Sequence, residues 1–399
     1  MPGRKVLYVS GSFGLGHVYR DLAIVEALRE RYSDLDFYWL AGDPASGVLK
    51  QAGETLVPEA AVYGNDTASA EKAARGQRLE LLSYLLGARG EWQRNVAAYK
   101  RAVEREQFAL VIADEAYEIA LWLLERPNVK RAPFVMIFDF VGLDTMSRSP
   151  LEWLGIYYFN RLWQNDGKMF GRSDALSLFI GELEDIPDRR FGPFLPNRRE
   201  HARTFYHPVG YILAFDPAKC LDRPQLRAEL GYGREPLIVC SIGGTAIGRE
   251  LLELCGQAFP IVQQSLPDVR MVLVCGPRLD PGLVKVPAGP EVRGYVPQLY
   301  KHFAASDLAV VQGGGSTTLE LTALRRPFLY FPREGDAEQG LMVGGRLARH
   351  GAGVRMQISS SSPALLAEAM LANIGKEVTY PPIPLDGARV AAQLIGRYL

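Results

Sequence analysis

The sequence has 399 residues, of which 48% are hydrophobic and 23% charged, and its 45 Lys and Arg residues balance its 45 Asp and Glu residues. At about 150 residues per domain, this length predicts two or three domains with sizeable cores. The zero net charge argues against nucleic acid as a partner, because basic side chains on phosphates supply much of the affinity for it.

The four cysteines are widely spaced and form no CxxC pair, which argues against a zinc ribbon or a disulfide framework and favours a reducing compartment. The sequence near the N-terminus holds no apolar stretch that resembles a secretory signal, and no uncharged apolar run reaches about 18 residues. We therefore expect a cytoplasmic protein without a membrane span, while peripheral membrane contact stays open.

Short apolar runs alternate with helix-period segments along the N-terminal half, a pattern typical of parallel α/β units. A glycine-rich turn at residues 11–16 leads into a helix with apolar side chains from Val18 to Tyr32 at spacings of three and four. Alternating charges over residues 75–106 indicate a pair of helices with a solvated face. The expected strands cover residues 5–10, 37–40, 108–113 and 134–138.

The segment from Pro150 to Trp163 is unusually aromatic. We expect it to form a buried helix. The alternative is that it offers an apolar acceptor site or a surface that contacts lipid.

The C-terminal half repeats the alternation after a segment rich in proline and turn residues, 192–224, which we interpret as a domain boundary. The expected strands cover residues 236–242, 270–275, 308–312 and 328–331, and the expected helices cover residues 250–265, 318–325, 339–349 and 390–399. The serine run 359–362 indicates a loop that caps a helix beginning near Pro363. These patterns predict two open α/β domains, each binding ligands beyond the carboxyl ends of its strands.

Three consecutive glycines, Gly313–Gly315, lie between an expected strand and an expected helix. Glycines let backbone N–H groups approach a ligand closely, and we expect the hydroxyls of Ser316 and Thr317 to cap the helix. Such donors, together with the helix dipole, suit a phosphate or diphosphate. Glu320, about one turn into the helix, can accept two sugar hydroxyls. The alternative is an ordinary tight turn followed by a solvated acid.

A shorter turn of the same kind is formed by Gly243, Gly244 and Thr245 after the expected strand 236–242. Alone it is equally consistent with an ordinary turn. Facing the first cluster, it would complete a diphosphate clamp.

The first glycine turn, Gly11-Ser12-Phe13-Gly14-Leu15-Gly16, departs from the GxGxxG spacing of dinucleotide sites and lacks the Lys of a P-loop. His17 follows it, and because imidazole titrates near neutrality it is a candidate general base, with helix capping as the alternative. Asp114 ends the strand 108–113 and should emerge at the same sheet edge, where it can orient the imidazole. Glu115 is the competing candidate for that role.

With His17 and the turn after Gln312, the sequence resembles the GT-B nucleotide-sugar glycosyltransferases. It is most similar to the branch that holds the peptidoglycan lipid-intermediate N-acetylglucosaminyltransferase and the natural-product and plant small-molecule transferases. Gly14-Leu15-Gly16-His17-Val18 resembles the N-terminal loop of that family. Four further stretches of the chain resemble the C-terminal donor site of that family, namely Gly294-Tyr295-Val296-Pro297, Asp307, Gly313–Glu320 and Pro327. The resemblance runs over most of the chain and is weakest in the middle third.

The resemblance implies an α/β protein of GT-B fold, with two facing Rossmann-like domains and an interdomain cleft. Residues 1–215 would form the acceptor-binding domain and residues 225–380 the donor-binding domain. The helix at 385–399 would pack back onto the first domain.

The resemblance also implies residue roles. His17 would deprotonate the acceptor hydroxyl, with Asp114 as its partner. Tyr295 and Val296 would contact the nucleobase, and Glu320 the ribose. The diphosphate would be cradled by Gly243, Gly244, Gly315, Ser316 and Thr317, and the donor-sugar hydroxyls would meet Glu338 and Gln339. Further candidate donor-binding residues are Thr245, Gln312, Gly314 and Asp336.

One position departs from the family pattern. Relatives often place His or Arg just before the phosphate glycines, where this chain has the neutral Gln312. The charge on the leaving diphosphate would then be met by helix dipoles and by Arg249 or Arg278.

Asp34-Leu35-Asp36 matches the DxD pattern with which some sugar transferases hold a divalent ion. It lies between the first helix and the second strand, at the wrong end of the sheet. We interpret the match as coincidence and expect no metal requirement.

These observations predict an inverting glycosyltransferase with His17 as general base. The donor would be a nucleoside-diphosphate sugar of UDP or dTDP type, and the acceptor a hydroxyl of a small, apolar or aromatic molecule such as a natural product. A nucleotide-sugar epimerase on the same fold and a non-catalytic subunit that activates a partner enzyme stay open, as do a monomer and a homodimer.

Overall fold

A computed structural model describes residues 3–11, 15–64, 74–75, 78–79, 81–145 and 149–399, with backbone alone between 74 and 88. The chain divides into two compact units. Unit 1 comprises Met1–Ala73, Leu81–Ala214 and Ile383–Leu399, and unit 2 comprises Ala74–Glu80 and Phe215–Pro382. Gly14, which belongs to the first glycine turn, lies outside the described residues, as do Ser12 and Phe13.

Unit 1 is built on a sheet of seven strands in the order β3-β2-β1-β6-β7-β8-β9, and every neighbouring pair is parallel. At its centre, Val6 pairs with Phe37 on one side and with Leu110 on the other. The strands are β1 (Arg4–Val9), β2 (Leu35–Leu40), β3 (Thr55–Leu56), β6 (Leu110–Asp114), β7 (Phe134–Phe138), β8 (Ala175–Phe179) and β9 (His207–Pro208).

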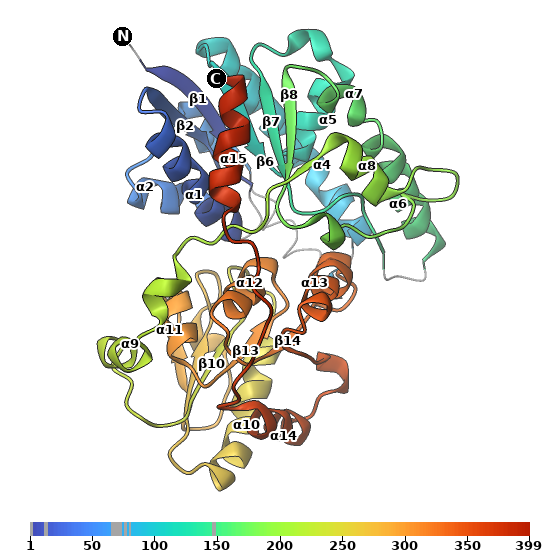
Figure 1. The fold of residues 1–399 in the computed structure, drawn as a ribbon. Helices are drawn as coiled ribbons and strands as arrows, with labels where there is room; N and C mark the ends of the chain where they lie inside the picture. The colour runs from blue at the N-terminus through green and yellow to red at the C-terminus, as the bar shows by residue number, and fades with distance from the viewer. Residues whose placement is uncertain (1–2, 12–14, 65–73, 76–77, 80, 146–148) are drawn as a thin grey trace. The chain divides into compact units, whose positions relative to one another are not determined.

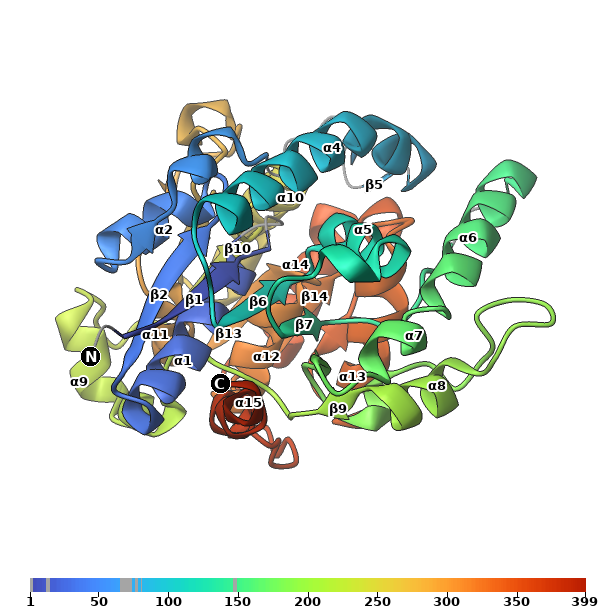
Figure 2. The same cartoon turned by 90° about the horizontal axis from the view of Figure 1, so that it is seen from above.

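Helices cover both faces of this sheet, because its inner strands are apolar on both sides. Val6 and Tyr8 pack with α1 (Gly16–Arg31), α2 (Ala45–Gln51) and α15 (Gly387–Ile395). Leu7 and Val9 face the other way, toward α4 (Leu81–Arg105), α5 (Tyr117–Glu125), α7 (Gly167–Phe170) and α8 (Arg198–Phe205). Figure 1 shows α15 beside α1, and Figure 2 shows α4 and α5 on the opposite side of the strands. The two ends of the chain thus share one core.

Unit 2 repeats the plan with six parallel strands in the order β12-β11-β10-β13-β14-β15. Its strands are β10 (Leu237–Ser241), β11 (Arg270–Val274), β12 (Glu291–Arg293), β13 (Leu308–Gln312), β14 (Phe328–Phe331) and β15 (Val354–Arg355). One face carries α10 (Arg249–Ser265) and α14 (Pro363–Asn373). The other carries α9 (Arg223–Glu229), α11 (Leu299–Ala305), α12 (Gly315–Ala323) and α13 (Gly344–Arg349).

Shorter elements complete the described chain. A two-stranded antiparallel ribbon pairs β4 (Ala74–Arg75) with β5 (Arg78–Leu79), and a π-helical turn, η6 (Glu338–Val343), leads directly into α13. The 3₁₀ turns are η1 (Pro58–Val62), η2 (Pro127–Val129), η3 (Leu183–Asp185), η4 (Pro217–Cys220), η5 (Pro281–Leu283), η7 (Ile358–Ser360) and η8 (Gly396–Tyr398). Within the described part of the chain, none of the helices combines the length and apolar composition that a bilayer span needs.

Both sheets have the Rossmann strand order, in which the chain starts in the middle, winds outward and then returns to wind in the other direction. The reversal falls between β1 and β6 in unit 1 and between β10 and β13 in unit 2. At such a reversal the connections after neighbouring strands leave on opposite faces, so a crevice opens beyond their carboxyl ends. The residues that follow these four strands are therefore the first place to look for function.

Several predicted elements are confirmed at their bounds, including β7, β13 and β14. The serine run caps α14 as expected, because the Ser362 hydroxyl accepts from the backbone N–H of Leu365 at 3.2 Å. The helix pair expected over residues 75–106 is wrong, since α4 is a single helix preceded by β4 and β5.

The expected burial of the aromatic helix is also wrong. The helix forms, as α6 (Pro150–Trp163), and Ile156 and Asn160 face inward. However, Leu151, Trp153 and Leu154 are 58–70% exposed. Asn160 holds the inner face in place through two hydrogen bonds to the backbone of Leu143. Its side-chain oxygen accepts from the N–H of Leu143, and its side-chain nitrogen donates to the Leu143 carbonyl oxygen. The apolar outer face therefore has no covering element among the described residues of unit 1.

Candidate functional site

In unit 1, polar side chains gather at the carboxyl ends of three neighbouring strands. His17 is the second residue of α1, which follows β1, whereas Asp114 is the last residue of β6. Asp139 comes directly after β7. Because β6 lies between β1 and β7 in a parallel sheet, all three residues emerge at one edge.

The residue after Asp114 has an unusual backbone. Glu115 adopts a positive φ of 49°, a conformation that costs a non-glycine residue free energy. Residues held in such conformations cluster at functional sites, where the surrounding structure determines them. As a result the two acids lie at different nitrogens of the His17 ring, Asp114 at Nδ1 and Glu115 at Nε2.

Asp114 is completely buried and binds two cationic neighbours. Its Oδ2 lies 3.0 Å from Nδ1 of His17, and the guanidinium of Arg20 donates to both carboxylate oxygens at 2.6 and 2.7 Å. Arg20 also donates to Asp139. Nδ1 of His17 also lies 2.9 Å from the guanidinium of Arg20. In the charged ring both nitrogens carry protons, so Nδ1 then donates to Asp114, and Nε2 is left for exchange with a substrate.

The charges around His17 set its protonation. Desolvation opposes a charged ring, but the carboxylates of Asp114 and Glu115 outweigh it and raise the pKa of His17 to about 10. Desolvation likewise opposes an ionised Asp114, but Arg20 and His17 outweigh it and hold the pKa of that carboxyl below its usual range. His17 is therefore an imidazolium at neutral pH and becomes a base as the pH approaches 10.

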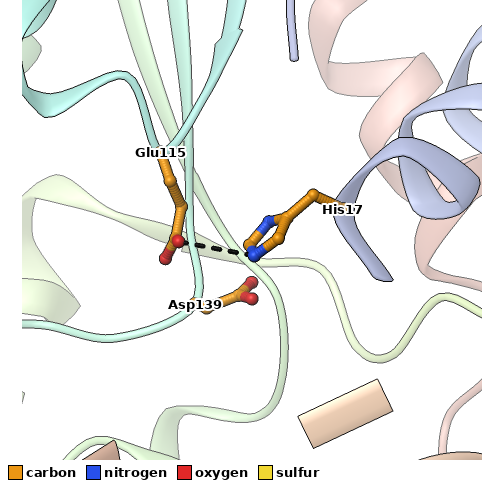
Figure 3. Close-up of side chains that lie close together, drawn as sticks. All are labelled: His17, Glu115 and Asp139. Carbon is orange, nitrogen blue, oxygen red and sulfur yellow. Dashed lines mark ion pairs between the residues drawn. The ribbon is translucent and has the colours of Figure 1, made fainter. Parts of the chain in front are cut away.

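Figure 3 shows the second nitrogen of the ring turned toward Glu115 and Asp139. Nε2 lies 3.6 Å from Oε2 of Glu115, and the ligand atoms of His17, Glu115 and Asp139 all lie within 4.8 Å of one another. Tyr117 donates its hydroxyl to Oε1 of Glu115 at 2.9 Å. The ring of Tyr117 thus adjoins the polar cluster.

An aromatic group continues from Tyr117. Its ring lies 5.5 Å from that of Phe140 and 5.1 Å from that of Trp163, and the last two are 5.6 Å apart. All three side chains are partly exposed, so they offer apolar faces beside the polar cluster. Stacking on such faces is a common way to hold a flat apolar ligand.

In unit 2 the two glycine turns follow the neighbouring strands β10 and β13 and lie at one edge of the sheet. Gly243 has a φ of 82°, which favours glycine, and its N–H donates to the hydroxyl of Ser241 at 3.2 Å. Gly244 is half-buried and Thr245 is buried. At Gly313, a Cβ would lie 2.8 Å from the Cα of Pro332, so the chain passes too closely for any side chain. At Gly314 a Cβ would meet nothing within 4 Å.

The helix after the second turn, α12, begins at Gly315 with Gly314 as N-cap, and no side chain caps it. The expected capping by Ser316 and Thr317 is therefore wrong: both lie within the first turn, Ser316 exposed and Thr317 half-buried. With Ser316 as the N-cap, the helix would begin at Thr317. It begins two residues earlier, at Gly315, because glycine is also accepted at the N-cap position. The first-turn N–H groups and the helix dipole still make this end attractive to an anion.

Arg346 of α13 brings a positive charge to this turn. Its guanidinium donates to the carbonyl oxygen of Gly315 at 2.7 Å and to the hydroxyl of Thr318 at 3.2 Å. Arg346 therefore occupies the place for which the sequence pattern suggests Arg249 or Arg278. Arg249 lies at the start of α10, half-exposed and 3.7 Å from Glu253. Gln312 itself is buried at the end of β13.

The remaining predicted donor residues follow strands β12, β13 and β14 of unit 2, some on loops and some on helices. Tyr295 and Val296 follow the edge strand β12, with Tyr295 44% exposed. Glu320 lies within α12 and Glu338 at the start of η6, both partly exposed.

Two predicted sugar-binding residues hold their own loop together. Asp336 forms a buried ion pair of 2.7 Å with Arg333 and accepts from the N–H of Gln339 at 3.2 Å. The side-chain oxygen of Gln339 accepts from the N–H of Arg333 at 2.9 Å. The loop after β14 is therefore internally braced, and the π-helical turn that follows is a feature often found at functional sites.

No protein-family model matches the chain. One relative is a UDP-N-acetylglucosamine--N-acetylmuramyl-(pentapeptide) pyrophosphoryl-undecaprenol N-acetylglucosamine transferase of Carboxydothermus hydrogenoformans. The two are 25% identical over 196 residues, a stretch that covers 48% of this chain and 49% of that protein. The chain is 36% identical over 139 residues to an uncharacterized glycosyltransferase of Methanosarcina acetivorans, covering 29% and 34% of the two. The chain thus spans about half or less of the length of these curated relatives.

Among solved structures, the glycotransferase of kitacinnamycin matches with a TM-score of 0.63 and 18% identity, over 100% of this chain and 99% of that one. The fold is GT-B. The strand order of both sheets agrees with this assignment. The predicted fold class and the resemblance to glycosyltransferases are confirmed.

Proposed function

We propose that this GT-B protein is an inverting glycosyltransferase. It moves a sugar from a nucleoside-diphosphate sugar of UDP or dTDP type to a hydroxyl of a small, partly aromatic acceptor. The observation that carries the proposal is the different chemistry of the two strand reversals: ionisable side chains after β1 and β6, and glycine turns with a helix N-terminus after β10 and β13. The relative from Carboxydothermus hydrogenoformans carries a UDP-sugar in its name, which supports the donor class.

In the proposed mechanism the acceptor oxygen attacks the anomeric carbon as the nucleoside diphosphate leaves from the opposite face. Nε2 of neutral His17 takes the acceptor proton, and Asp114 and Arg20 hold the ring in place. The leaving diphosphate is stabilised by backbone N–H groups of Gly244–Thr245 and Gly315–Thr317, with the guanidinium of Arg346 as the nearby charge.

The other assignments follow the family resemblance. Tyr295 and Val296 contact the nucleobase, Glu320 the ribose, and Glu338 the donor sugar. Asp336 and Gln339 shape that loop through their bonds to Arg333. In unit 1 the acceptor lies against Tyr117, which bonds Glu115, and against the neighbouring rings of Phe140 and Trp163.

Thermal unfolding with a panel of UDP, dTDP, GDP and ADP tests the donor class, with NAD as control. A ligand at about 100 times its Kd stabilises the folded state by about 2.7 kcal/mol, which shifts the Tm measurably. We expect UDP or dTDP to raise the Tm and NAD to leave it unchanged. A shift with NAD alone would contradict the proposal. Release of nucleoside diphosphate only when an acceptor is present then separates a transferase from an epimerase.

A further inference from the structure

The Nε2 side of His17 is lined by carboxylates from two other elements. His17 comes from α1, Glu115 from the turn after β6, and Asp139 from the turn after β7. Their ligand atoms converge within 4.8 Å, and the pair formed by Nε2 and Oε2 of Glu115 is already 3.6 Å apart (Figure 3). One imidazole nitrogen and two carboxylate oxygens is a donor set typical of divalent transition-metal sites.

Each of these three side chains also contacts a neighbour outside the group. Arg20 is shared, because it contacts both Asp139 and Nδ1 of His17. Asp114 binds Nδ1 of His17, which directs the lone pair of Nε2 into the cluster. Tyr117 binds Oε1 of Glu115, and Arg20 binds Oδ1 of Asp139. Such supporting bonds orient the ligands in metal sites, and a carboxylate behind a ligating histidine is the commonest of them. A chance group of surface acids does not show this second layer.

The local charge also calls for a cation. Three carboxylates, Asp114, Glu115 and Asp139, face the guanidinium of Arg20 and the charged ring of His17. One negative charge is left at neutral pH, and two are left once a metal ion displaces the proton from Nε2. A divalent ion would cancel both. With metal–ligand bonds of about 2.0–2.2 Å, tetrahedral donors lie about 3.4 Å apart, so the cluster contracts by no more than about 1.4 Å to bind.

We propose that His17, Glu115 and Asp139 bind a divalent transition-metal ion, with Zn²⁺ as the best fit, and that the bound ion is an inhibitor. Nε2 cannot hold a metal and accept a proton at once, so occupation removes the base of the proposed transfer reaction. The inhibitory consequence rests on the proposed function, whereas the binding site itself does not.

Calorimetric titration of the full chain with Zn²⁺ tests the site directly. We expect one ion per chain in the wild type and a Kd at least tenfold weaker in both Glu115→Gln and Asp139→Asn, which keep the shape and remove a ligand charge. Asp36→Asn is the matched control, because Asp36 is an exposed acid at the opposite end of its strand. The four cysteines are buried and do not compete. Equal affinities in the wild type and both site variants, or no binding at all, would overturn the proposal.

A second measurement separates this proposal from the transferase proposal. Thermal shifts with UDP, recorded with and without Zn²⁺, report the donor site independently of the metal site. Stabilisation by UDP without Zn²⁺ binding would defeat the metal site alone. Zn²⁺ binding that depends on Glu115 and Asp139, in a protein that transfers no sugar, would uphold the metal site and defeat the transferase. Where both hold, Zn²⁺ should abolish transfer in the wild type, and a chelator should restore it.

Discussion

The two strand reversals differ in what they place at the sheet edge. After β1, β6 and β7, unit 1 presents side chains that can carry charge, namely His17, Asp114, Glu115 and Asp139. After β10 and β13, unit 2 presents glycines and the uncapped start of α12, with one guanidinium close by. The same strand order thus presents ionisable side chains in one unit and open backbone in the other.

Under the proposed function, the two units would divide the work of group transfer between them. Proton transfer needs titratable groups whose pKa values the surroundings can shift, and unit 1 supplies them. Binding of a diphosphate needs many short N–H contacts without steric obstruction, and glycines supply those. The predictions below test whether substitutions in each unit affect only the function assigned to it.

The largest expected effect is that of His17→Ala on transfer. A positioned base contributes about 10²–10⁴-fold to the rate, so kcat should fall by that factor. The thermal shift with UDP should stay at the wild-type value, because unit 2 is unchanged. Unaltered turnover would remove His17 from the mechanism, and a lost UDP shift would break the division between the two units.

Two adjacent glycines of unit 2 should separate folding from donor binding. In Gly313→Ala the new Cβ would lie 2.8 Å from the backbone of Pro332, so we expect a loss of about 1–3 kcal/mol of unfolding free energy. In Gly314→Ala the methyl meets nothing within 4 Å and φ is −67°, so stability should fall by about 1 kcal/mol or less.

UDP affinity should respond in the opposite order. Gly314 is the N-cap of α12, next to the first-turn N–H groups, so we expect its added methyl to crowd the charge-assisted hydrogen bonds and to weaken UDP binding about tenfold. Isothermal titration with UDP and urea unfolding of both variants measure the two effects. Wild-type UDP affinity in Gly314→Ala would place the diphosphate elsewhere.

The sequence is a good guide to the fold where strands are buried on both faces. The runs at β7 and β14 are apolar throughout, and that at β13 is apolar up to its last residue, Gln312, so their bounds are visible in the sequence. The edge strands β3, β9 and β15 have two residues each and leave no such pattern. The buried strand β8 was missed because Ser177 interrupts its apolar run, although the hydroxyl is satisfied by the carbonyl oxygen of Phe205.

The candidate site was predicted where a polar residue follows a buried strand. Asp114 was found by that rule, and Asp139 meets it equally after β7 but was overlooked. Arg20 and Arg346 could not be found, because charged residues on helices are usually solvated and only tertiary partners show otherwise. The exposed face of α6 was misjudged for a related reason: composition does not tell whether a helix face has a neighbour.

A smaller effect is expected from Arg346→Gln. Losing the guanidinium near Gly315 should weaken UDP binding about fivefold at low salt, and the difference should shrink as salt screens the charge. Arg349→Gln is the control, since Arg349 is an exposed residue of the same helix and should leave the affinity unchanged. Titrations at two ionic strengths measure both variants. Equal losses in the two would indicate a general electrostatic effect instead of a local contact.

The finest test uses the pH profile of unit 1. Because the pKa of His17 is raised to about 10, kcat/KM measured in the presence of a chelator should rise about tenfold per pH unit and level off near pH 10. Glu115 helps to raise that pKa, so Glu115→Gln should move the plateau about one unit toward lower pH. The Asp36→Asn profile should match the wild type.

Stability should follow the same titration. The folded-state pKa of His17 lies above its ordinary value of 6.5, so the stabilisation from its charged form is fully present below about pH 6.5 and is lost as pH rises through 10. In Glu115→Gln this loss should end at lower pH, whereas UDP affinity over the same range should be that of the wild type. Urea unfolding at several pH values measures the loss of stability, and titration with UDP over the same pH range measures the affinity. A shift in UDP affinity would show that the carboxylates of unit 1 act on the donor, and that the division between the two units is incomplete.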